Sequence, residues 1–391
     1  MTEKGDYILW LPLWYPNRTE PYSGDFIQRH ARAASAFRHI EVLAVIRDLS
    51  MPPGTVEEVT VHTESLFETI VYYNTSNGPF GLLNRLRSLL KYRSLIRKGS
   101  EKIFRSKGMP AALHTHIYGK NCHIALQLSR SCKIPLFFSE HQTGFLKVSP
   151  VSFHQWVLFD RFLLKKFLSA VTGASVVSDY LGKSVQAFYP SLTYEVIPNV
   201  VDEEVFSPLP VVSDGYKVRF INISTLSYQK NFEGVISSFQ KVLKVYSDFE
   251  LRVFGPVTAQ WQTKVKEAGL EGYIIFEGEQ PHEKILPVLQ SADALILYSR
   301  FETFGCVLIE ALSCGTPVIV SDIEPMREII QEREDSIMVE GECPEKLAKA
   351  LLSFIKQPLK PDRVKLHKQI SERFGMKRVG QMFENFYQHS I

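Results

Sequence analysis

The 391-residue sequence predicts an α/β protein built from two doubly wound, Rossmann-like domains that face each other across a cleft. Short apolar runs alternate with amphipathic stretches along most of the chain, which is the pattern of βαβ units in parallel sheets. The chain is also too long for one ordinary core and suits two domains. Because ligands of doubly wound sheets bind at the carboxyl ends of the strands, two facing sheets would form a cleft for a large substrate pair.

The second half of the chain shows this alternation most clearly. Its expected strands are rich in Ile, Val, Leu and Phe, which is typical of strands buried on both faces. They cover residues 217–223, 250–254, 273–276, 294–298, 317–320 and 336–339. Helical patterns separate them, for example residues 231–246, whose apolar side chains recur on one side.

The first half repeats the pattern less regularly. Its expected strands cover residues 7–11, 40–45, 112–115, 136–139 and 174–177, with a hairpin or a pair of extended segments within 57–74. Its expected helices cover residues 24–37, 82–104, 119–131, 157–168 and 179–188.

A Pro-Asn turn followed by acidic residues at 197–202 marks the expected domain boundary. We therefore expect an acceptor-side domain over 1–198, a nucleotide-sugar-binding domain over 199–373 and a C-terminal segment over 374–391. The last periodic stretch, 376–387, predicts a helix that packs back on the first domain.

Composition narrows the class of protein. The chain is 45% hydrophobic and 22% charged, as soluble globular proteins are, and it has no apolar run of about 18 residues. Its first residues lack the pattern of a signal peptide. Five cysteines without CxxC spacing indicate free thiols and a cytoplasmic location, with no zinc site of that type.

Charge is unevenly distributed. Residues 1–200 carry 23 Lys and Arg against 15 Asp and Glu. No basic face with interleaved aromatics points to nucleic acid, so an anionic acceptor or membrane surface is the better partner. Within 80–107 there are nine basic residues and one acid, with leucines near helical spacing. This stretch predicts either peripheral contact with an anionic membrane or an ordinary helix packed on the sheet.

The most informative segment is 299–322. An expected strand ends in a polar loop, and a helix is expected to start near Phe304, where N–H groups favour an anion such as a diphosphate. Glu302 precedes that helix, and Glu310 follows about two turns later. Two carboxylates so placed suit a ligand with several hydroxyl groups. The alternative is that both are surface acids.

This segment resembles the E-x7-E signature of retaining glycosyltransferases of family 4, which have the GT-B fold. The matching positions are Ser299, Glu302, Phe304, Gly305, Glu310, Ala311, Gly315, Pro317, Val318 and Asp322. The resemblance implies that Glu302 binds hydroxyls of the donor sugar and that Glu310 holds the ribose. It also implies that the backbone of Phe304, Gly305 and Cys306 meets the diphosphate.

Other positions extend the resemblance. Residues 196–202 are similar to the family's linker, and Gly255 follows a strand expected to flank the nucleotide base. Lys230 stands where the family has a diphosphate-binding lysine, but Thr225 replaces the usual arginine. A lone lysine lacks the bidentate fork of arginine, so Arg300 is a candidate for a second cation. The alternative for Lys230 is a solvated lysine at a helix start.

The first domain contributes weaker signals. Gly24 matches a family glycine that approaches the diphosphate and acceptor, and the alternative is a simple turn glycine. His141 matches a histidine that touches the donor sugar, and the alternative is a structural histidine. The His114 and His116 pair resembles an H-x-H at the cleft floor, and a zinc site there would need a third ligand.

Together these features predict a retaining, hexosyl-type glycosyltransferase that needs no cofactor or metal. Its catalytic residues would be Glu302, His141 and Lys230. The donor is expected to be a nucleoside diphosphate sugar, and the acceptor a glycan or lipid-linked saccharide of polysaccharide or cell-envelope synthesis. The alternatives are a sugar-nucleotide epimerase of the same fold and a catalytically inactive GT-B scaffold.

Overall fold

The computed structural model describes residues 5–75, 81–209, 217–330 and 335–389. They form two compact units: unit 1 comprises Met1–Val200 with Met376–Ile391, and unit 2 comprises Val201–Gly375. The last helix of the chain therefore belongs to unit 1.

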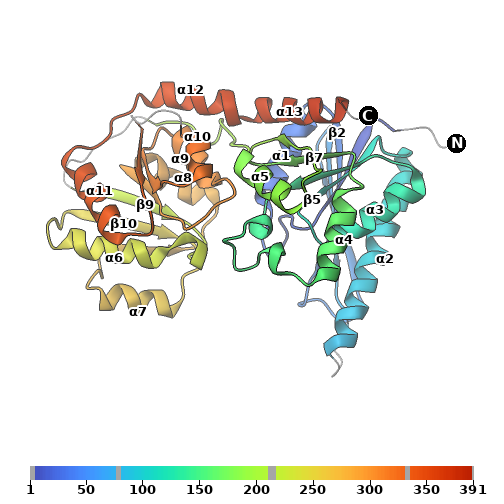
Figure 1. The fold of residues 1–391 in the computed structure, drawn as a ribbon, viewed down its shortest axis with the longest axis horizontal. Coiled ribbons are helices and arrows are strands. Elements are labelled where there is room, and N and C mark those ends of the chain that lie inside the picture. The colour runs from blue at the N-terminus through green and yellow to red at the C-terminus, as the bar shows by residue number, and fades with distance from the viewer. Residues whose placement is uncertain (1–4, 76–80, 210–216, 331–334, 390–391) are drawn as a thin grey trace. The chain divides into compact units, whose positions relative to one another are not determined.

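The described part of unit 1 contains an eight-stranded sheet in the order β3-β4-β2-β1-β5-β6-β7-β8. All neighbours are parallel except β3, which pairs antiparallel with β4. The strands are β1 (Tyr7–Pro12), β2 (His39–Arg47), β3 (Val56–His62), β4 (Leu66–Tyr73), β5 (Ala112–His116), β6 (Leu136–Glu140), β7 (Gly173–Val176) and β8 (Glu195–Val196). Its α-helices are α1 (Asp25–Ser35), α2 (Gly81–Lys107), α3 (Lys120–Cys132), α4 (Leu158–Leu168), α5 (Asp179–Phe188) and α13 (Met376–Gln388) (Figure 1).

Helix α13 packs along α1 inside unit 1 (Figure 1). The two backbones come so close that a Cβ on Gly380 would lie 2.2 Å from the carbonyl oxygen of Ala33. At the edge of this contact, Arg38 donates to both carboxylate oxygens of Glu384 at 2.7 and 2.8 Å. A larger side chain than glycine at residue 380 would force the helices apart.

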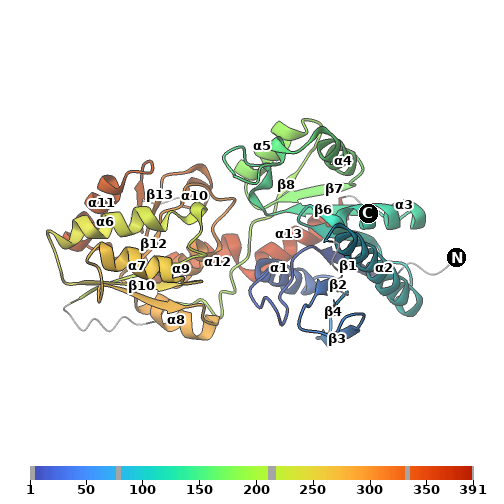
Figure 2. The same ribbon diagram turned by 90° about the horizontal axis from the view of Figure 1, so that it is seen from below.

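The described part of unit 2 contains a six-stranded parallel sheet in the order β11-β10-β9-β12-β13-β14. The strands are β9 (Val218–Ile223), β10 (Phe249–Phe254), β11 (Ile274–Gly278), β12 (Ala294–Leu297), β13 (Val318–Ser321) and β14 (Ser336–Val339). The α-helices are α6 (Phe232–Leu243), α7 (Ala259–Glu267), α8 (His282–Ser291), α9 (Cys306–Ser313), α10 (Glu324–Ile329), α11 (Pro344–Lys356) and α12 (Arg363–Phe374). They cover both faces of the sheet (Figure 2).

The strand orders fix where each unit can bind a ligand. Counted from β9, unit 2 has the order 3-2-1-4-5-6 of a dinucleotide-binding fold, and its winding reverses between β9 and β12. Unit 1 reverses in the same way between β1 and β5. In such sheets the crevice outside the carboxyl ends of the strands at the reversal is the binding site.

The elements expected in the second half all occur, with strand ends within two residues of the prediction. The motif helix begins at Cys306, two residues after the predicted start near Phe304. Gly305 has a φ of 111°, which is outside the helical range, and so it caps the helix instead of joining it.

Candidate active site

Two loops meet at the carboxyl ends of the switch-point strands of unit 2. The loop after β9 runs through residues 224–231, and the loop after β12 runs through 298–305. They are joined by a hydrogen bond from the backbone N–H of Arg300 to the carbonyl of Gln229, at 2.8 Å. The first loop holds Leu226 at a φ of 52°, a conformation that costs a leucine energy and that clusters at functional sites.

Glu302 is the centre of this site. The residue is 4% exposed, and its carboxylate accepts hydrogen bonds from both loops. Lys230 Nζ lies 2.5 Å and Ser299 Oγ 2.7 Å from Oε1. Gln229 Nε2 lies 2.9 Å from Oε2. Because a buried charge is costly without partners, these donors are what allows an ionised carboxylate at this position.

The burial overturns the simpler alternatives for three residues. Glu302 and Glu310 are 4% and 3% exposed, so neither is a surface acid. The side chain of Lys230 is 18% exposed and paired with Glu302, so it is not a solvated lysine. Gln229 did not stand out in the sequence, although it adjoins Lys230.

Helix α9 carries Glu310 on its second turn, inside unit 2. The helix starts after Gly305, and its first-turn N–H groups point back along the helix axis toward the loop that contains Glu302. Phe304 is buried, with its ring 5.7 Å from that of Phe374, so only its backbone is available to a ligand. Cys306 opens the helix and is partly exposed.

Gly255 is required by the packing of unit 2. Its φ is 146°, and a Cβ would lie 1.9 Å from the carbonyl oxygen of Ser224. The end of β10 therefore approaches the β9 loop more closely than any other residue would permit. This explains the glycine structurally, and a contact with a nucleotide stays a prediction.

The position usually held by arginine is neutral. Thr225 is exposed, and its hydroxyl donates to Ser227 Oγ at 3.1 Å. Arg300, the candidate replacement, is engaged in holding the same loop. Its Nη1 donates to the carbonyl of Tyr228 at 2.6 Å, its Nε donates to Glu342 at 2.8 Å, and its guanidinium lies 4.3 Å from the centre of the Tyr228 ring.

Unit 1 gathers four buried histidines around its own strand ends. His114 and His116 lie on β5 with ring centres 4.2 Å apart, and His116 Nδ1 is 3.3 Å from His141 Nε2. His30 on α1 lies 5.4 Å from His141, ring centre to ring centre. His30 did not stand out in the sequence, although its helical spacing from Ala34 places it on the buried face of α1.

Hydrogen bonds assign the protonation state of His114. Trp10 Nε1 donates to the hydroxyl of Tyr387 at 3.1 Å, and that hydroxyl lies 2.6 Å from His114 Nδ1. Nδ1 is then the acceptor, and Nε2–H donates to Ser139 Oγ at 2.8 Å. The C-terminal helix thus anchors a histidine of the cluster.

The histidines are neutral near pH 7. Burial lowers the pKa of His30 to about 4. The pKa values of His114, His116 and His141 are also lowered well below the usual range, by burial first and then by neighbouring imidazoles. His141 can therefore exchange a hydrogen bond with a hydroxyl, but it supplies no positive charge.

Glu140, next to His141, is a buried acid whose structural role was not evident from the sequence. Burial raises its pKa to about 7, against the effect of backbone N–H donors. The N–H groups of His141 and Gln142 donate to its Oε1 at 2.8 and 3.0 Å, and that of Tyr118 donates to Oε2 at 3.3 Å. Glu140 thereby fixes the backbone that presents His141.

Gly24 caps α1 with a φ of 71°. A Cβ there would lie 2.6 Å from the carbonyl group of Trp14, so the turn itself demands glycine. Any contact with the diphosphate or acceptor stays a prediction. Within the described residues, no group of three or more His, Cys, Asp or Glu side chains is arranged to hold a metal ion.

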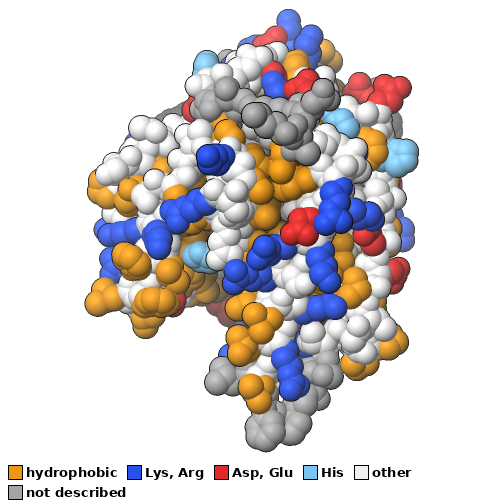
Figure 3. Space-filling view, turned by 90° about the vertical axis from the view of Figure 1, so that its right-hand side faces the viewer, with side chains coloured by type: hydrophobic (Ala, Val, Ile, Leu, Met, Phe, Trp, Pro, Cys, Tyr) orange, Lys and Arg blue, Asp and Glu red, His pale blue; other side chains and the backbone are white. Residues whose placement is uncertain are grey.

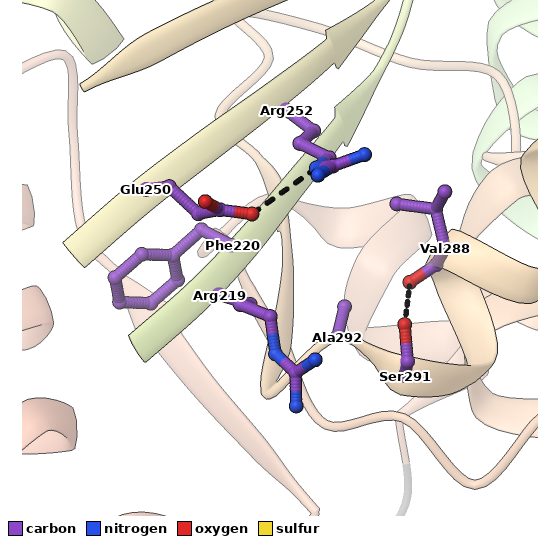
Figure 4. A pocket seen from close by; sticks show the side chains of 7 residues that line it. All are labelled: Arg219, Phe220, Glu250, Arg252, Val288, Ser291 and Ala292. Atoms are coloured by element: carbon purple, nitrogen blue, oxygen red, sulfur yellow. Dashed lines mark hydrogen bonds and ion pairs between the residues drawn. The ribbon is translucent and has the colours of Figure 1, made fainter. Parts of the chain in front are cut away.

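A separate cavity of about 140 Å³ lies near the amino ends of β9 and β10 (Figure 4). Arg252 and Glu250 pair at 3.1 Å on its wall (Figure 4). Its lining residues are Arg219, Phe220, Glu250, Arg252, Val288, Ser291 and Ala292. Because ligands of doubly wound sheets bind at the opposite, carboxyl ends, this cavity is not the candidate site.

The basic stretch of the first half forms most of α2. Phe80 lies outside the described residues. The second half of the helix is packed, with Tyr92, Ile96 and Phe104 buried, whereas its leucines before residue 91 that the structure describes are exposed. The helix therefore packs only in part. None of the helices in the described ranges is long and apolar enough to cross a membrane.

Residues 210–373 match the family of glycosyl transferases group 1. The matched stretch contains the loops that carry Lys230, Glu302 and Glu310, so the candidate site lies within the part of the chain that is similar to this family.

Two curated relatives are similar to about half of the chain. The chain is 24% identical over 51% of its length to N-acetyl-alpha-D-glucosaminyl L-malate synthase of Bacillus anthracis, of which 54% is covered. It is 25% identical over 57% of its length to alpha-monoglucosyldiacylglycerol synthase of Streptococcus pneumoniae, of which 54% is also covered. The chain thus spans only somewhat more than half the length of these relatives.

Solved structures show the fold over the whole chain. Sucrose-phosphate synthase from Thermosynechococcus elongatus superimposes with a TM-score of 0.78 at 16% identity, over 98% of both chains. HepE from Anabaena, solved in complex with UDP, gives a TM-score of 0.70 at 14% identity, over 98% of this chain and 100% of that one. The predicted GT-B fold of two Rossmann-like units is confirmed.

Proposed function

We propose that the chain is a retaining glycosyltransferase that moves a hexosyl-type group from a nucleoside diphosphate sugar to a hydroxyl acceptor. The observation that carries this proposal is the buried Glu302 at the switch point of unit 2, held by Lys230. A carboxylate beside a lysine offers a hydrogen-bond acceptor for sugar hydroxyls and a cation for a diphosphate.

The two charges would separate when a donor binds. The diphosphate attracts Lys230, and Glu302 then keeps Ser299 and Gln229 while accepting from hydroxyls of the sugar. N–H groups at the start of α9 would add to the stabilisation of the diphosphate. Glu310 would hold the ribose from the same helix.

The reaction needs no cofactor or metal in this proposal. The acceptor oxygen forms a bond to the anomeric carbon, the bond from that carbon to the diphosphate oxygen breaks, and the acceptor proton passes to the leaving phosphate. Catalysis then consists of positioning and of charge stabilisation by Lys230. The neutral His141 would contribute a hydrogen bond to the donor sugar, and Gly24 and Gly255 would allow close backbone approach.

We propose a lipid-linked saccharide or glycan of the cell envelope as the acceptor, used on the cytoplasmic side of a membrane. The alpha-monoglucosyldiacylglycerol synthase of Streptococcus pneumoniae supports this class, because its name is that of an enzyme that makes a glycolipid. The HepE complexes with UDP and UDP-glucose make a uridine donor the first to test.

The test is a panel of nucleoside diphosphate sugars, first ranked by the rise in melting temperature that each causes. The best donor is then incubated with saccharide and glycolipid acceptors, and the product's anomeric configuration is read by NMR. Transfer with retained configuration supports the proposal, and inverted configuration contradicts its mechanism. Conversion of the donor sugar into an epimer would show an epimerase, and binding without turnover of any donor would show an inactive scaffold.

A further inference from the structure

Helix α2 is built from two different halves. Its second half is packed against unit 1, whereas four leucines of its first three turns, Leu83, Leu86, Leu89 and Leu90, are 47–55% exposed. Figure 1 shows these first turns extending beyond the rest of unit 1. Leucines at this spacing normally pack on a neighbour, and here no described part of the chain buries them.

A second apolar group lies at the start of α4. Val157, Leu158, Phe159 and Phe162 are at least 60% exposed, and so are Val148 and Val151 just before them. Both α2 and α4 pack against α3, so the two groups belong to one side of the same unit. Figure 3 shows hydrophobic side chains in two groups on the lower part of this face, with Lys and Arg side chains beside them.

Positive charge accompanies both groups. Arg85, Arg87 and Arg93 are exposed among the leucines of α2. Lys147 is exposed before α4, and Lys165 and Lys166 are exposed in its last turn, about two turns from the apolar side chains at its start, against one exposed acid, Asp160. Apolar side chains with cations on the same helix suit the surface of an anionic bilayer, because the apolar side chains can enter the acyl region while the cations contact lipid phosphates.

We propose that the starts of α2 and α4 form a docking surface that holds unit 1 on an anionic lipid bilayer. Two separate protruding groups can both enter a deformable bilayer, whereas a stable dimer needs about 800 Å² of continuous, complementary surface on each partner. The bilayer contact is peripheral. It does not depend on transferase activity, so the docking surface and the proposed function can be tested separately.

The test is co-sedimentation of the full chain with vesicles of phosphatidylcholine alone or mixed with phosphatidylglycerol, at low and high salt. We expect binding to the anionic vesicles at low salt and most of it to be lost at high salt. R85E/R87E should weaken binding about 30-fold or more, since each basic residue near the surface contributes about fivefold. L86S/L90S and F159S/F162S should each weaken it at least about tenfold.

Matched controls come from unit 2. V245S/V364S removes two exposed valines, and K349E/K368E reverses two exposed lysines. Both controls should bind like the wild type. The proposal is overturned if the wild type does not prefer anionic vesicles at low salt, or if the controls weaken binding as much as the tested variants. A dimer that L86S/L90S dissociates, without vesicle binding, would assign the surface to a second copy of the chain.

A measurement on the wild-type chain tests the proposal without relying on variants that could misfold. Amide hydrogen exchange in residues 83–93 and 157–162 should slow when anionic vesicles are added, while exchange in α6 should not change. Unchanged exchange in both segments would also overturn the proposal.

Discussion

Unit 1 and unit 2 each place a strained residue and buried polar side chains at the switch point of a parallel sheet. The strained residues are Ile117, with a φ of 65°, after β5 and Leu226, with a φ of 52°, after β9. Beside them, unit 1 buries four histidines, whereas unit 2 buries no histidine among its described residues and instead holds Glu302 against Lys230. The same winding thus presents neutral imidazoles in one unit and a charge pair in the other.

The difference indicates how the two units would share a reaction. A charge pair can be opened by a charged ligand, because a diphosphate competes for the lysine. Neutral histidines can only exchange hydrogen bonds and fill space, which suits positioning of uncharged hydroxyl groups. The two units should therefore respond differently to pH, to mutation and to the phosphates of a ligand.

We expect the largest difference between the two units in their response to acid, which should destabilise unit 1 more than unit 2. The buried histidines of unit 1 have folded-state pKa values below the unfolded value near 6.5, so the unfolded state binds more protons. Their contribution to stability is complete above pH 6.5 and is lost as the pH falls toward 4. For His30 alone, with a pKa of about 4, the loss by pH 5.5 is about 1.4 kcal/mol.

Amide hydrogen exchange between pH 7.5 and pH 5.5, corrected for the intrinsic rates, would follow both units at once. Unit 1 should lose protection before unit 2, because its four histidines together outweigh Glu140, whose pKa of about 7 favours the folded state as the pH falls through this range. His30→Gln, which keeps a donor for the carbonyl of Pro198, should reduce this loss, and His62→Gln at an exposed position should not. Equal loss in both units would mean that the histidines do not set the acid response.

The next largest effect is expected on turnover, when the carboxylate of Glu302 is removed. In the proposed reaction, Glu302→Ala would lose charge-assisted hydrogen bonds of about 1.5–3 kcal/mol each to the donor sugar, so turnover should fall about 10²-fold or more. Glu340→Ala is the control, because Glu340 is an exposed glutamate of the same unit. The measurement is the initial rate with the identified donor. If turnover of Glu302→Ala stays within about threefold of the wild type, Glu302 is not a catalytic residue.

The sequence predicted unit 2 well because its signals are local. Runs of Ile, Val and Leu mark each strand, and the motif around Glu302 lies within 24 consecutive residues, 299–322. What the sequence could not show was pairing across the chain. Lys230 and Glu302 are 72 residues apart, and only the neighbouring β9 and β12 bring their loops together.

Unit 1 was harder to predict because its important contacts have no local signature. His30 lies on the buried face of α1, but its partners Pro198, His141 and Phe383 are all more than 100 residues away in the sequence. The leucines of α2 recur near helical spacing, as in a packed helix, in its first half as well as beside the packed Ile96. Where the packing partner stops depends on the extent of the sheet, which periodicity does not encode.

A smaller effect is expected for Lys230. Lys230→Ala should weaken binding of the nucleoside diphosphate about tenfold and leave binding of the nucleoside unchanged, since its partner would be the phosphate. Lys241→Ala, at another lysine of unit 2, serves as the control. Calorimetry with both ligands gives the loss of affinity of the variant, relative to the wild type, for the nucleoside diphosphate and for the nucleoside. An equal loss for both would show that Lys230 mainly supports the loop around Glu302.

The smallest effect concerns how the lysine loop is held in the absence of the usual arginine. Arg300 grips the loop through the Tyr228 carbonyl and ring while it also pairs with Glu342. Lysine cannot make these contacts together, because it lacks the planar fork. Arg300→Lys should therefore destabilise the ordered conformation of the loop by about 1 kcal/mol. Amide exchange in residues 225–231 should become faster, and diphosphate binding should weaken about fivefold. If Arg300 instead contacted the diphosphate directly, affinity would fall while amide exchange in the ligand-free protein stayed at the wild-type rate. Exchange and calorimetry on this one variant thus tell whether Arg300 positions Lys230 or replaces the missing arginine.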